Sequence, residues 1–253
     1  MSEIVFLDTT IQIRRNYGSL EEIARIREQL RGRRVITSTY VLAEFNRTVV
    51  QDAVILHNIV ASEPTVSEAL IRLSALRRHD YTTASRCYLL LAMLEQRSGL
   101  SRDRLLATLA GALEAEFMKD FSTGIEMMTN QTDCALAKNR PVRKGNTYHL
   151  DLGCVREIER CDLIRFVENR RDELRVIQAA LKEHGDDPIL VRMADVLTEV
   201  IEDSRRALGR KNCWVLGDVF IALECPPEAY IYTSNVRHLE PIAAAIGKKV
   251  LPF

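Results

Sequence analysis

The sequence predicts an α/β protein with a three-layer α/β/α arrangement around a parallel sheet and a large all-helical insertion. Short apolar runs typical of buried strands lie only near the two ends of the chain, at Ile4–Leu7 and at residues 35–37, 229–232 and 249–251. Between the second and third of these runs, apolar residues recur at three- and four-residue spacing, as they do in helices. We therefore expect the two ends of the chain to complete one sheet.

The amino-terminal part of the chain alternates strand and helix patterns. Ile4–Leu7 has the composition of a buried strand, and Ser19 with Glu22 forms a capping box that begins a helix. Residues 35–37 resemble a second buried strand, and Thr39 is placed to cap the helix that follows. A β-α-β-α order implies a right-handed crossover and therefore parallel strands.

The middle of the chain has the pattern of successive helices. Thr65 and Glu68 form a second capping box. Residues 139–153 carry Pro, Gly and basic residues, which predicts an exposed loop. The stretches with helical spacing are residues 81–96, 101–121, 155–183 and 188–208. We expect a core of residues 1–50 and 209–253 and one helical insertion, residues 51–208, packed beside it.

Composition excludes several classes of protein. The 35 basic residues balance 35 acidic ones, so nucleic acid could bind only at a local basic patch. No apolar run approaches the roughly 20 residues of a transmembrane helix, and the amino terminus lacks the basic segment of a signal peptide. The six cysteines have no CxxC spacing, which favours reduced thiols. We expect a cytoplasmic protein with no membrane partner.

Acidic residues follow or precede the predicted strands. Asp8 comes directly after the first strand, Glu44 lies one turn into the helix after the second, and Asp218 begins the segment before the third. Ligands of parallel sheets bind at the carboxyl ends of the strands, where these carboxylates would meet and repel one another. A divalent cation relieves that repulsion, and Mg²⁺ and Mn²⁺ prefer oxygen ligands. Such an ion lowers the pKa of a bound water molecule. The water then loses a proton more easily and can attack a phosphodiester as a nucleophile.

The sequence resembles a known family at this point. The segments IVFLDTT, STYVLAEFNR, LGDVFIAL and IYTSNVRHL, in this order, are similar to the four signature segments of PIN-domain ribonucleases, which include the toxins of bacterial toxin–antitoxin pairs. The resemblance covers roughly residues 1–50 and 210–253. It implies a PIN-like fold, RNA as the substrate, and Asp8, Glu44 and Asp218 as the catalytic, metal-binding acids.

The chain departs from the family pattern in two ways. Asn235 occupies the family's fourth acidic position, where its amide oxygen can serve as a metal ligand but adds no charge. Asn235 is equally suited to cap the following helix. The other departure is length, because a compact domain has about 100–150 residues and this chain is longer by roughly a hundred.

Further residues are candidates for binding the substrate. Threonine and serine hydroxyls after the third predicted strand can orient a phosphate oxygen, and arginines near the acids can pair with RNA phosphates. The alternative for each arginine is a solvated surface position, and the alternative for His238, a potential proton shuttle, is a plain helix-surface histidine. The substrate-binding candidates are Thr233, Ser234, Arg14, Arg15, Arg47 and Arg237.

A structural zinc site in the insertion is a separate hypothesis. Its cysteine and histidine candidates surround the loop at residues 139–153. Their spacing matches no standard zinc signature, and cysteines at helical spacing are usually small core residues. The candidates are Cys134, His149, Cys154 and Cys161.

Three functional hypotheses follow. The first is a metal-dependent endoribonuclease that leaves 5′-phosphate and 3′-hydroxyl ends, with a structured RNA such as tRNA as its substrate. The second is a catalytically weakened PIN scaffold that binds RNA or a protein partner. The third is a DNA nuclease of the same fold. The sequence leaves open whether an antitoxin partner exists and whether the chain forms a homo-oligomer.

Overall fold

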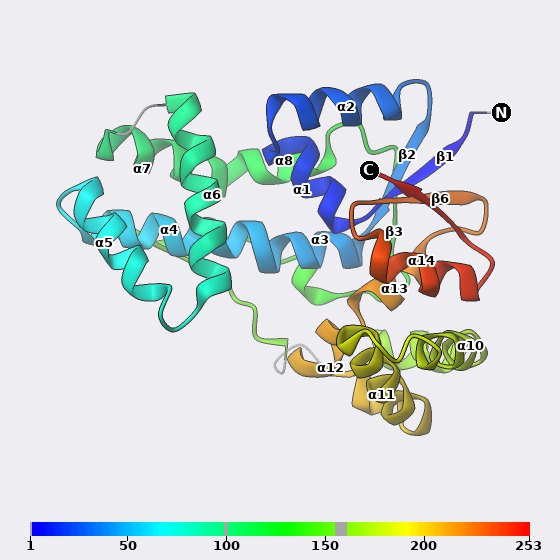
Figure 1. The fold of residues 1–253 in the computed structure, drawn as a ribbon. Helices are drawn as coiled ribbons and strands as arrows, with labels where there is room; N and C mark the ends of the chain where they lie inside the picture. Colours follow the sequence, from blue (N-terminus) through cyan, green and yellow to red (C-terminus); the bar gives the residue numbers. More distant parts are fainter. Residues whose placement is uncertain (1, 99–100, 155–160) are drawn as a thin grey trace. The chain divides into compact units, whose positions relative to one another are not determined.

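The computed structural model describes residues 2–98, 101–154 and 161–253. The chain forms two compact units, which we call the sheet unit and the helical unit (Figure 1). The sheet unit consists of Met1–Glu44, Gly124–Lys138 and Gly153–Phe253, and the helical unit consists of Phe45–Thr123 and Asn139–Leu152.

This division differs from the expected single insertion at residues 51–208. Residues 124–138 belong to the sheet unit because they contain a strand that pairs with the sheet. Residues 161–208 belong to it as well, because their helices pack on each other and on the last helix of the chain. Residues 45–50 of the expected core belong to the helical unit, so only residues 1–44 and 209–253 of that core lie in the sheet unit.

The sheet has five parallel strands in the order β3-β2-β1-β6-β7. The strand at the centre of this order comes from the amino terminus and pairs with β2 on one side and with β6, from the opposite end of the chain, on the other. The α/β class and the reunion of the chain ends are as the sequence predicts. The strands are β1 (Ile4–Leu7), β2 (Arg34–Ser38), β3 (Met127–Thr129), β6 (Ala229–Thr233) and β7 (Lys249–Pro252).

The edge strand β3 is not among the predicted strands. It has only three residues, and its first two side chains, Met127 and Met128, are 47% and 41% exposed. Such a segment has neither an apolar run nor an alternation of buried and exposed residues. It is a strand because Ile36–Ser38 of β2 offers it main-chain partners.

Helices cover both faces of the sheet (Figure 1). On one face, α1 (Thr9–Tyr17) and α2 (Leu20–Leu30) contribute Ile11 and Ile26 to a buried cluster that includes Leu7 of β1. The capping box that begins α2 is present as expected.

The opposite face packs against α3 (Thr39–Phe45) and α13 (Gly217–Glu224) (Figure 1). Neighbouring side chains of a strand alternate between faces, so Phe6 of β1 points to this side, where it is fully buried. Tyr40 of α3 and Phe220 of α13 meet edge to face, with ring centroids 5.6 Å apart. The contact fixes α3 against α13.

A lysine side chain forms hydrogen bonds with the carboxyl-terminal end of α13. The ammonium group of Lys248 donates hydrogen bonds to the main-chain oxygens of Ala222 at 2.6 Å, Leu223 at 3.3 Å and Cys225. These carbonyls have no partner within the helix, so a cation there satisfies them and complements the helix dipole.

A helical hairpin completes the sheet unit. α10 (Arg171–Lys182) packs on α11 (Pro188–Glu202) and on α14 (Val236–Ala245), and α9 (Leu163–Asn169) precedes them. Residues 155–160 of the expected helix at 155–183 lie outside the described residues. The 3₁₀ turn Ser204–Ala207 and α12 (Arg210–Val215) lead from α11 to α13.

The helical unit is built around α4, which contacts α5, α6, α7 and a small hairpin. The expected helices at residues 81–96 and 101–121 are present, the second divided by a π-helical turn. The helices are α4 (Gln51–Ser62), α5 (Val66–Leu76), α6 (Tyr81–Ser98), α7 (Arg102–Gly111) and α8 (Phe117–Ser122), with π-helical turns at Asn46–Val50 and Ala112–Glu116.

The expected loop at residues 139–153 contains a two-stranded hairpin, β4 (Val142–Lys144) and β5 (Thr147–His149). The side-chain amide of Asn58 in α4 pairs with both main-chain polar groups of Tyr148, each at 2.8 Å. This contact takes the place of a neighbouring strand, which local sequence patterns do not predict.

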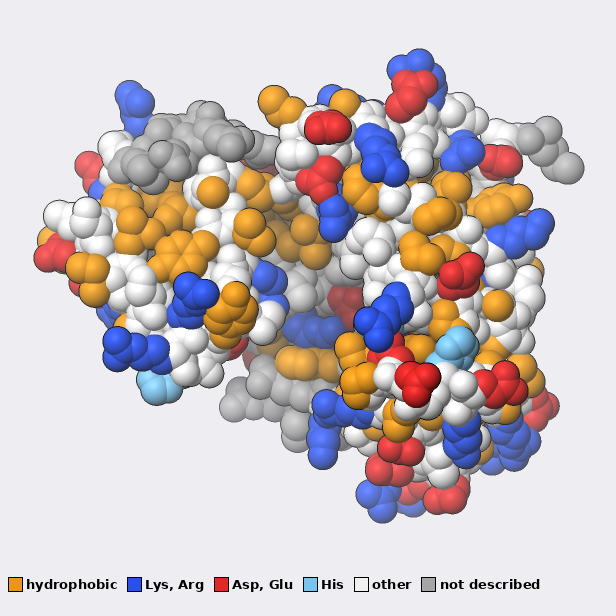
Figure 2. Space-filling view, viewed as in Figure 1, with side chains coloured by type: hydrophobic (Ala, Val, Ile, Leu, Met, Phe, Trp, Pro, Cys, Tyr) orange, Lys and Arg blue, Asp and Glu red, His pale blue; other side chains and the backbone are white. Residues whose placement is uncertain are grey.

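Basic and acidic side chains are interspersed over the face of each unit shown in Figure 2, in keeping with a net charge of zero. Among the helices that the structure describes, none has both the length and the apolar character needed to cross a membrane.

Candidate active site

The strand order reverses between β1 and β6. Chain order runs from β1 through β2 to β3 in one direction and from β6 to β7 in the other. The carboxyl ends of two such strands diverge into a crevice where open α/β sheets bind ligands. Asp8 follows β1 and Asn235 lies just beyond β6, so the sequence-predicted residues lie at this point.

Asp8 is both a helix cap and a buried carboxylate. It is 2% exposed and accepts hydrogen bonds from the main-chain N–H of Ile11 at 2.9 Å and the hydroxyls of Thr10 at 2.8 Å and Thr233 at 2.6 Å. Burial raises its pKa to about 6, although the bonds from Thr233, Ile11 and Thr10 oppose the shift. Asp8 therefore caps α1 and also belongs to the cluster of acids.

Glu44 reaches the same region from α3. Its carboxylate accepts a hydrogen bond of 2.6 Å from the hydroxyl of Thr9. On the other side it rests on the backbone of α13, because a Cβ added to Gly217 would lie 2.4 Å from Oε1 of Glu44. Only glycine leaves room for the carboxylate here.

Asp218 is the second residue of α13. An aspartate at the start of a helix is a common N-cap, but here the N-cap position belongs to Leu216. The side chain of Asp218 is 20% exposed, and burial, followed by the negative charges of Glu44 and Asp8, raises its pKa to about 8. Each of these two acids is therefore close enough to Asp218 to disfavour its ionised form.

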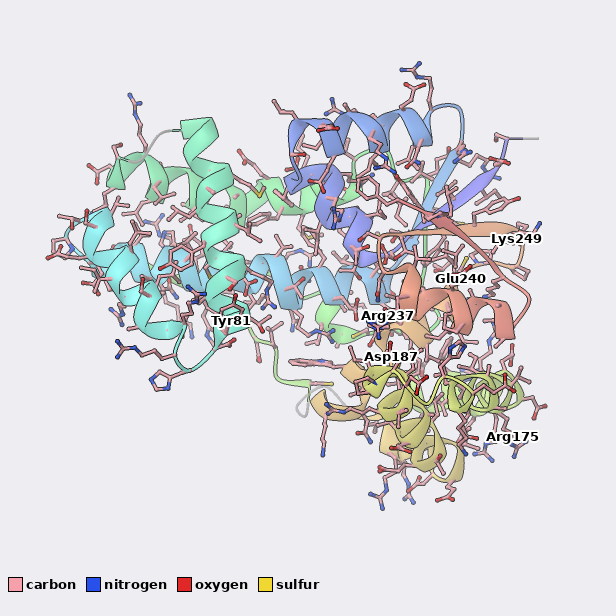
Figure 3. The ribbon with its side chains drawn as sticks, viewed as in Figure 1. Tyr81, Arg175, Asp187, Arg237, Glu240 and Lys249 are labelled. Atoms are coloured by element: carbon pink, nitrogen blue, oxygen red, sulfur yellow. The ribbon has the colours of Figure 1, made fainter. Side chains whose placement is uncertain are left out.

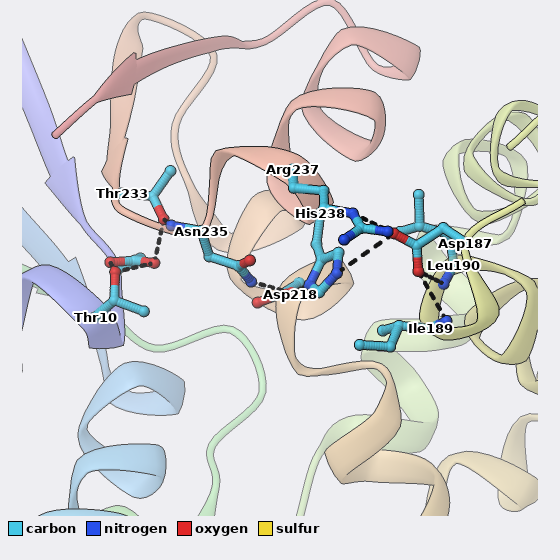
Figure 4. Close-up of polar contacts among 10 residues, drawn as sticks. Thr10, Asp187, Ile189, Leu190, Asp218, Thr233, Asn235, Arg237 and His238 are labelled. Atoms are coloured by element: carbon cyan, nitrogen blue, oxygen red, sulfur yellow. Dashed lines mark hydrogen bonds and ion pairs between the residues drawn. The ribbon is translucent and has the colours of Figure 1, made fainter.

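Asn235 contacts the cluster through its side chain. It occupies the N-cap position of α14 but makes no side-chain capping bond. Its amide nitrogen instead donates to Oδ2 of Asp218 at 2.9 Å (Figure 4). Its main-chain N–H donates to the hydroxyl of Thr233, and that of Ser234 donates to the hydroxyl of Thr10. The segment after β6 is thus tied to both Asp8 and Asp218.

The predicted arginines are in different surroundings. Arg14 pairs with Glu22 and lies 5.1 Å from the ring centre of Phe253. Arg15 follows it on α1, and Arg47 belongs to the helical unit. Arg237 pairs with an aspartate of the sheet unit, described below.

The donor set of the cluster suits a hard cation. It consists of three carboxylates and one amide, all oxygen ligands of the type that Mg²⁺ and Mn²⁺ prefer. In the part of the chain that the structure describes, no three His, Cys, Asp or Glu side chains are arranged to hold a metal ion. The fit therefore rests on the mutual repulsion of the acids, which an ion between them would relieve.

The zinc candidates divide between the units. His149 lies in the helical unit, whereas Cys134, Cys154 and Cys161 lie in the sheet unit. Burial raises the pKa of Cys134 to about 12, and the nearby Cys213, followed by the other two cysteines, contributes. Cys134, Cys154 and Cys161 form no disulfide, and no metal-holding group occurs among the described residues. Buried thiols with raised pKa values are characteristic of packing residues.

Comparisons with known protein families, curated proteins and solved structures find no match to this chain.

Sequence reasoning missed three residues of the site. Thr9 and Thr10 are not among the predicted site residues, yet they donate to Glu44 and Asp8. Gly217 has no local signature, because its importance comes from a side chain far away in the sequence. The pair of threonines after Asp8 was the available signal.

We expect Gly217→Ala to weaken divalent-metal binding about tenfold while leaving the fold stable. The new methyl group must displace the flexible end of Glu44 rather than the backbone, and alanine favours the helix by up to about 1 kcal/mol. Calorimetric titration with Mn²⁺ measures the first effect and urea unfolding the second. Gly111→Ala, at a helical position with no neighbour closer than 3.9 Å, is the control. Unchanged Mn²⁺ affinity in Gly217→Ala would show that the position of Glu44 is irrelevant to the ion.

We expect the metal-free protein to lose stability as pH rises from about 4 to about 8. Asp8 and Asp218 release their protons near pH 6 and 8 in the folded chain but near 3.8 when unfolded, so the unfolded state holds fewer protons in this range. Asp218→Asn should be more stable than the wild type by about 2 kcal/mol at pH 8 and equal to it near pH 4. Urea unfolding in EDTA measures this, with the exposed Asp172→Asn as the control. If the unfolding free energies of Asp218→Asn and the wild type change with pH in the same way, the raised pKa of Asp218 is contradicted.

Proposed function

We propose that this protein is a metal-dependent nuclease of the PIN-domain type that hydrolyses RNA. The observation that carries the proposal is the convergence of Asp8, Glu44 and Asp218 at the switch point of a parallel sheet. They come from three separate elements, and two of them have strongly raised pKa values. Perturbed acids gathered at a ligand-binding edge are typical of functional sites.

A purely structural role does not account for this arrangement. Burial of mutually repelling carboxylates destabilises the fold, and apolar residues at the same positions would avoid that repulsion. A divalent cation converts the repulsion into attraction. Asp8, Glu44 and Asp218 would hold it, with Asn235 beside Asp218. When bound, such a cation polarises a phosphodiester and makes a water molecule more acidic.

Threonine hydroxyls orient Asp8 and Glu44. Thr9 fixes Glu44, while Thr10 and Thr233 both donate to Asp8, so each hydroxyl hydrogen is directed at a carboxylate. Their bonds leave the carboxylates in defined positions before any ligand arrives. Preorganised ligands bind an ion with less loss of side-chain freedom.

The choice of RNA rests on the resemblance of the four sequence segments to PIN-domain ribonucleases. The chemistry of the acids would serve DNA equally well. A scaffold that only binds RNA or a protein partner is the second candidate, and it is favoured by the uncharged Asn235 at the family's fourth acidic position.

One experiment separates these functions. We expect wild-type protein with Mn²⁺ to cleave single-stranded RNA, and Asp8→Asn to be inactive yet folded, because the ion loses a charged ligand. Digestion of matched RNA and DNA oligonucleotides measures the substrate, and Asp172→Asn is the control for a lost surface charge. Cleavage of DNA alone would favour the DNA nuclease. No cleavage and no Mn²⁺ binding would favour the binding scaffold.

We expect Asn235→Asp to raise the affinity for Mn²⁺ about threefold to tenfold. A fourth carboxylate adds attraction for the ion, partly offset by repulsion from Asp218, whose Oδ2 lies 2.9 Å from the amide nitrogen of Asn235. Calorimetric titration of the two proteins measures the change. Unchanged affinity would place Asn235 outside the coordination of the ion.

A further inference from the structure

Arg237 lies in the first turn of α14, two residues after Asn235. Its Nε atom is 2.7 Å from Oδ2 of Asp187, and the two side chains point toward each other (Figures 3 and 4). The side chain of Arg237 is 73% exposed, whereas that of Asp187 is 10% exposed. The arginine is therefore attached at one side and accessible to solvent over most of its surface.

Asp187 is itself held firmly. It is the N-cap of α11, and its Oδ1 accepts hydrogen bonds from the main-chain N–H groups of Ile189 at 2.9 Å and Leu190 at 3.4 Å. One carboxylate oxygen is thus used by the helix, and the other, Oδ2, faces Arg237. The helix end therefore holds Asp187, and Asp187 forms an ion pair with Arg237.

His238 connects this pair to the acids of the candidate active site. Its Nε2 lies 3.7 Å from Oδ2 of Asp187, and its Nδ1 lies 4.0 Å from Oδ2 of Asp218 (Figure 4). Arg237 is therefore joined to Asp218 through two intervening side chains. It lies beside the cluster without neutralising it directly.

We propose that the first turn of α14 carries a phosphate-binding site for a nucleic-acid strand, in which Arg237 binds the phosphate and Asp187 positions Arg237. The inference rests on the proposed nuclease function and names the group that holds the strand. A guanidinium presents five N–H donors in a planar fork that matches two phosphate oxygens. Nε lies 2.7 Å from Asp187, and because the arginine side chain is 73% exposed, its guanidinium can also meet a phosphate from the solvent side.

A cation beside the acids would offset their negative charge. Three carboxylates repel a polyanionic strand, and attraction by the ion falls off away from it. A fixed cation next to the cluster holds the adjacent phosphate and sets the register of the strand. If Asp187 and Arg237 only join α11 to α14, they form a partly exposed ion pair, which contributes little to stability and nothing to RNA binding.

The salt dependence of RNA affinity distinguishes the two roles. The full chain carries Asp8→Asn in every sample, so that the strand is not cut, and binding of a labelled single-stranded RNA is measured by fluorescence anisotropy at several salt concentrations. Each lost phosphate contact lowers the slope of log K against log salt by about 0.7 for a single strand. We expect Arg237→Ala to show this loss and to weaken binding about tenfold. Arg237→Lys should restore the slope but not the full affinity, because lysine lacks the planar fork.

Asp187→Asn tests the positioning role. Asparagine is an equally good N-cap, so α11 keeps its two hydrogen bonds, but an amide NH₂ facing Arg237 cannot hold Nε. We expect RNA binding to weaken about threefold with the unfolding free energy unchanged, and no further effect when Arg237→Ala is already present. Asp203→Asn is the matched control, because Asp203 also caps a helical turn and also pairs with an arginine, Arg205, at 3.0 Å.

Three outcomes would overturn the proposal: an unchanged slope in Arg237→Ala, tighter RNA binding in Asp187→Asn, or an equal effect of Asp187→Asn with and without Arg237. Failure here is separable from failure of the proposed function. If the wild-type protein cleaves RNA but Arg237→Ala leaves the slope of log K against log salt unchanged, only the phosphate site is contradicted. If Arg237→Ala lowers this slope but the wild-type protein does not cleave RNA, the phosphate site is supported and the nuclease function is contradicted.

Discussion

The parallel pairing of β1 with β6 is the interaction on which the sheet and its site depend. The two strands come from opposite ends of the chain, and their hydrogen bonds extend to Asp8, whose main-chain N–H donates to the carbonyl of Tyr232. This pairing creates the reversal of strand order. It also brings Thr233 within 2.6 Å of Asp8, so the same contact that closes the sheet builds the first part of the site.

The electrostatics of the site oppose the stability of the fold. Asp8 is almost fully buried and Asp218 largely so, and burial together with the neighbouring acids makes ionisation of Asp218 unfavourable. Threonine hydroxyls and the amide of Asn235 offset part of this penalty by donating to the carboxylates. Natural proteins retain such unfavourable clusters chiefly where function requires them. A divalent cation bound there would reverse the balance, since it would replace repulsion between like charges with attraction.

The helical hairpin of α10 and α11 positions the residues beside the acids. Packing of α10 on α14 sets the position of the first turn of α14, and the cap of α11 delivers Asp187 to the same turn. His238 lies between Asp187 and Asp218. The α10–α11 hairpin, which was expected to be part of an insertion, is therefore a structural part of the sheet unit. The amino-terminal end of α11 lies beside the first turn of α14.

The sequence by itself determined the α/β class and the strands at the two chain ends, because apolar runs are local patterns. It also singled out three candidate acids, Asp8 directly after a strand, and Glu44 and Asp218 in segments that resemble the PIN-domain signatures. Only the tertiary structure decided that β3 joins the sheet, that Gly217 must lack a side chain for Glu44 to fit, and that Asp187 holds Arg237. Each of these depends on a partner distant in sequence. No local periodicity records such a partner, since the contact exists only once the chain has folded.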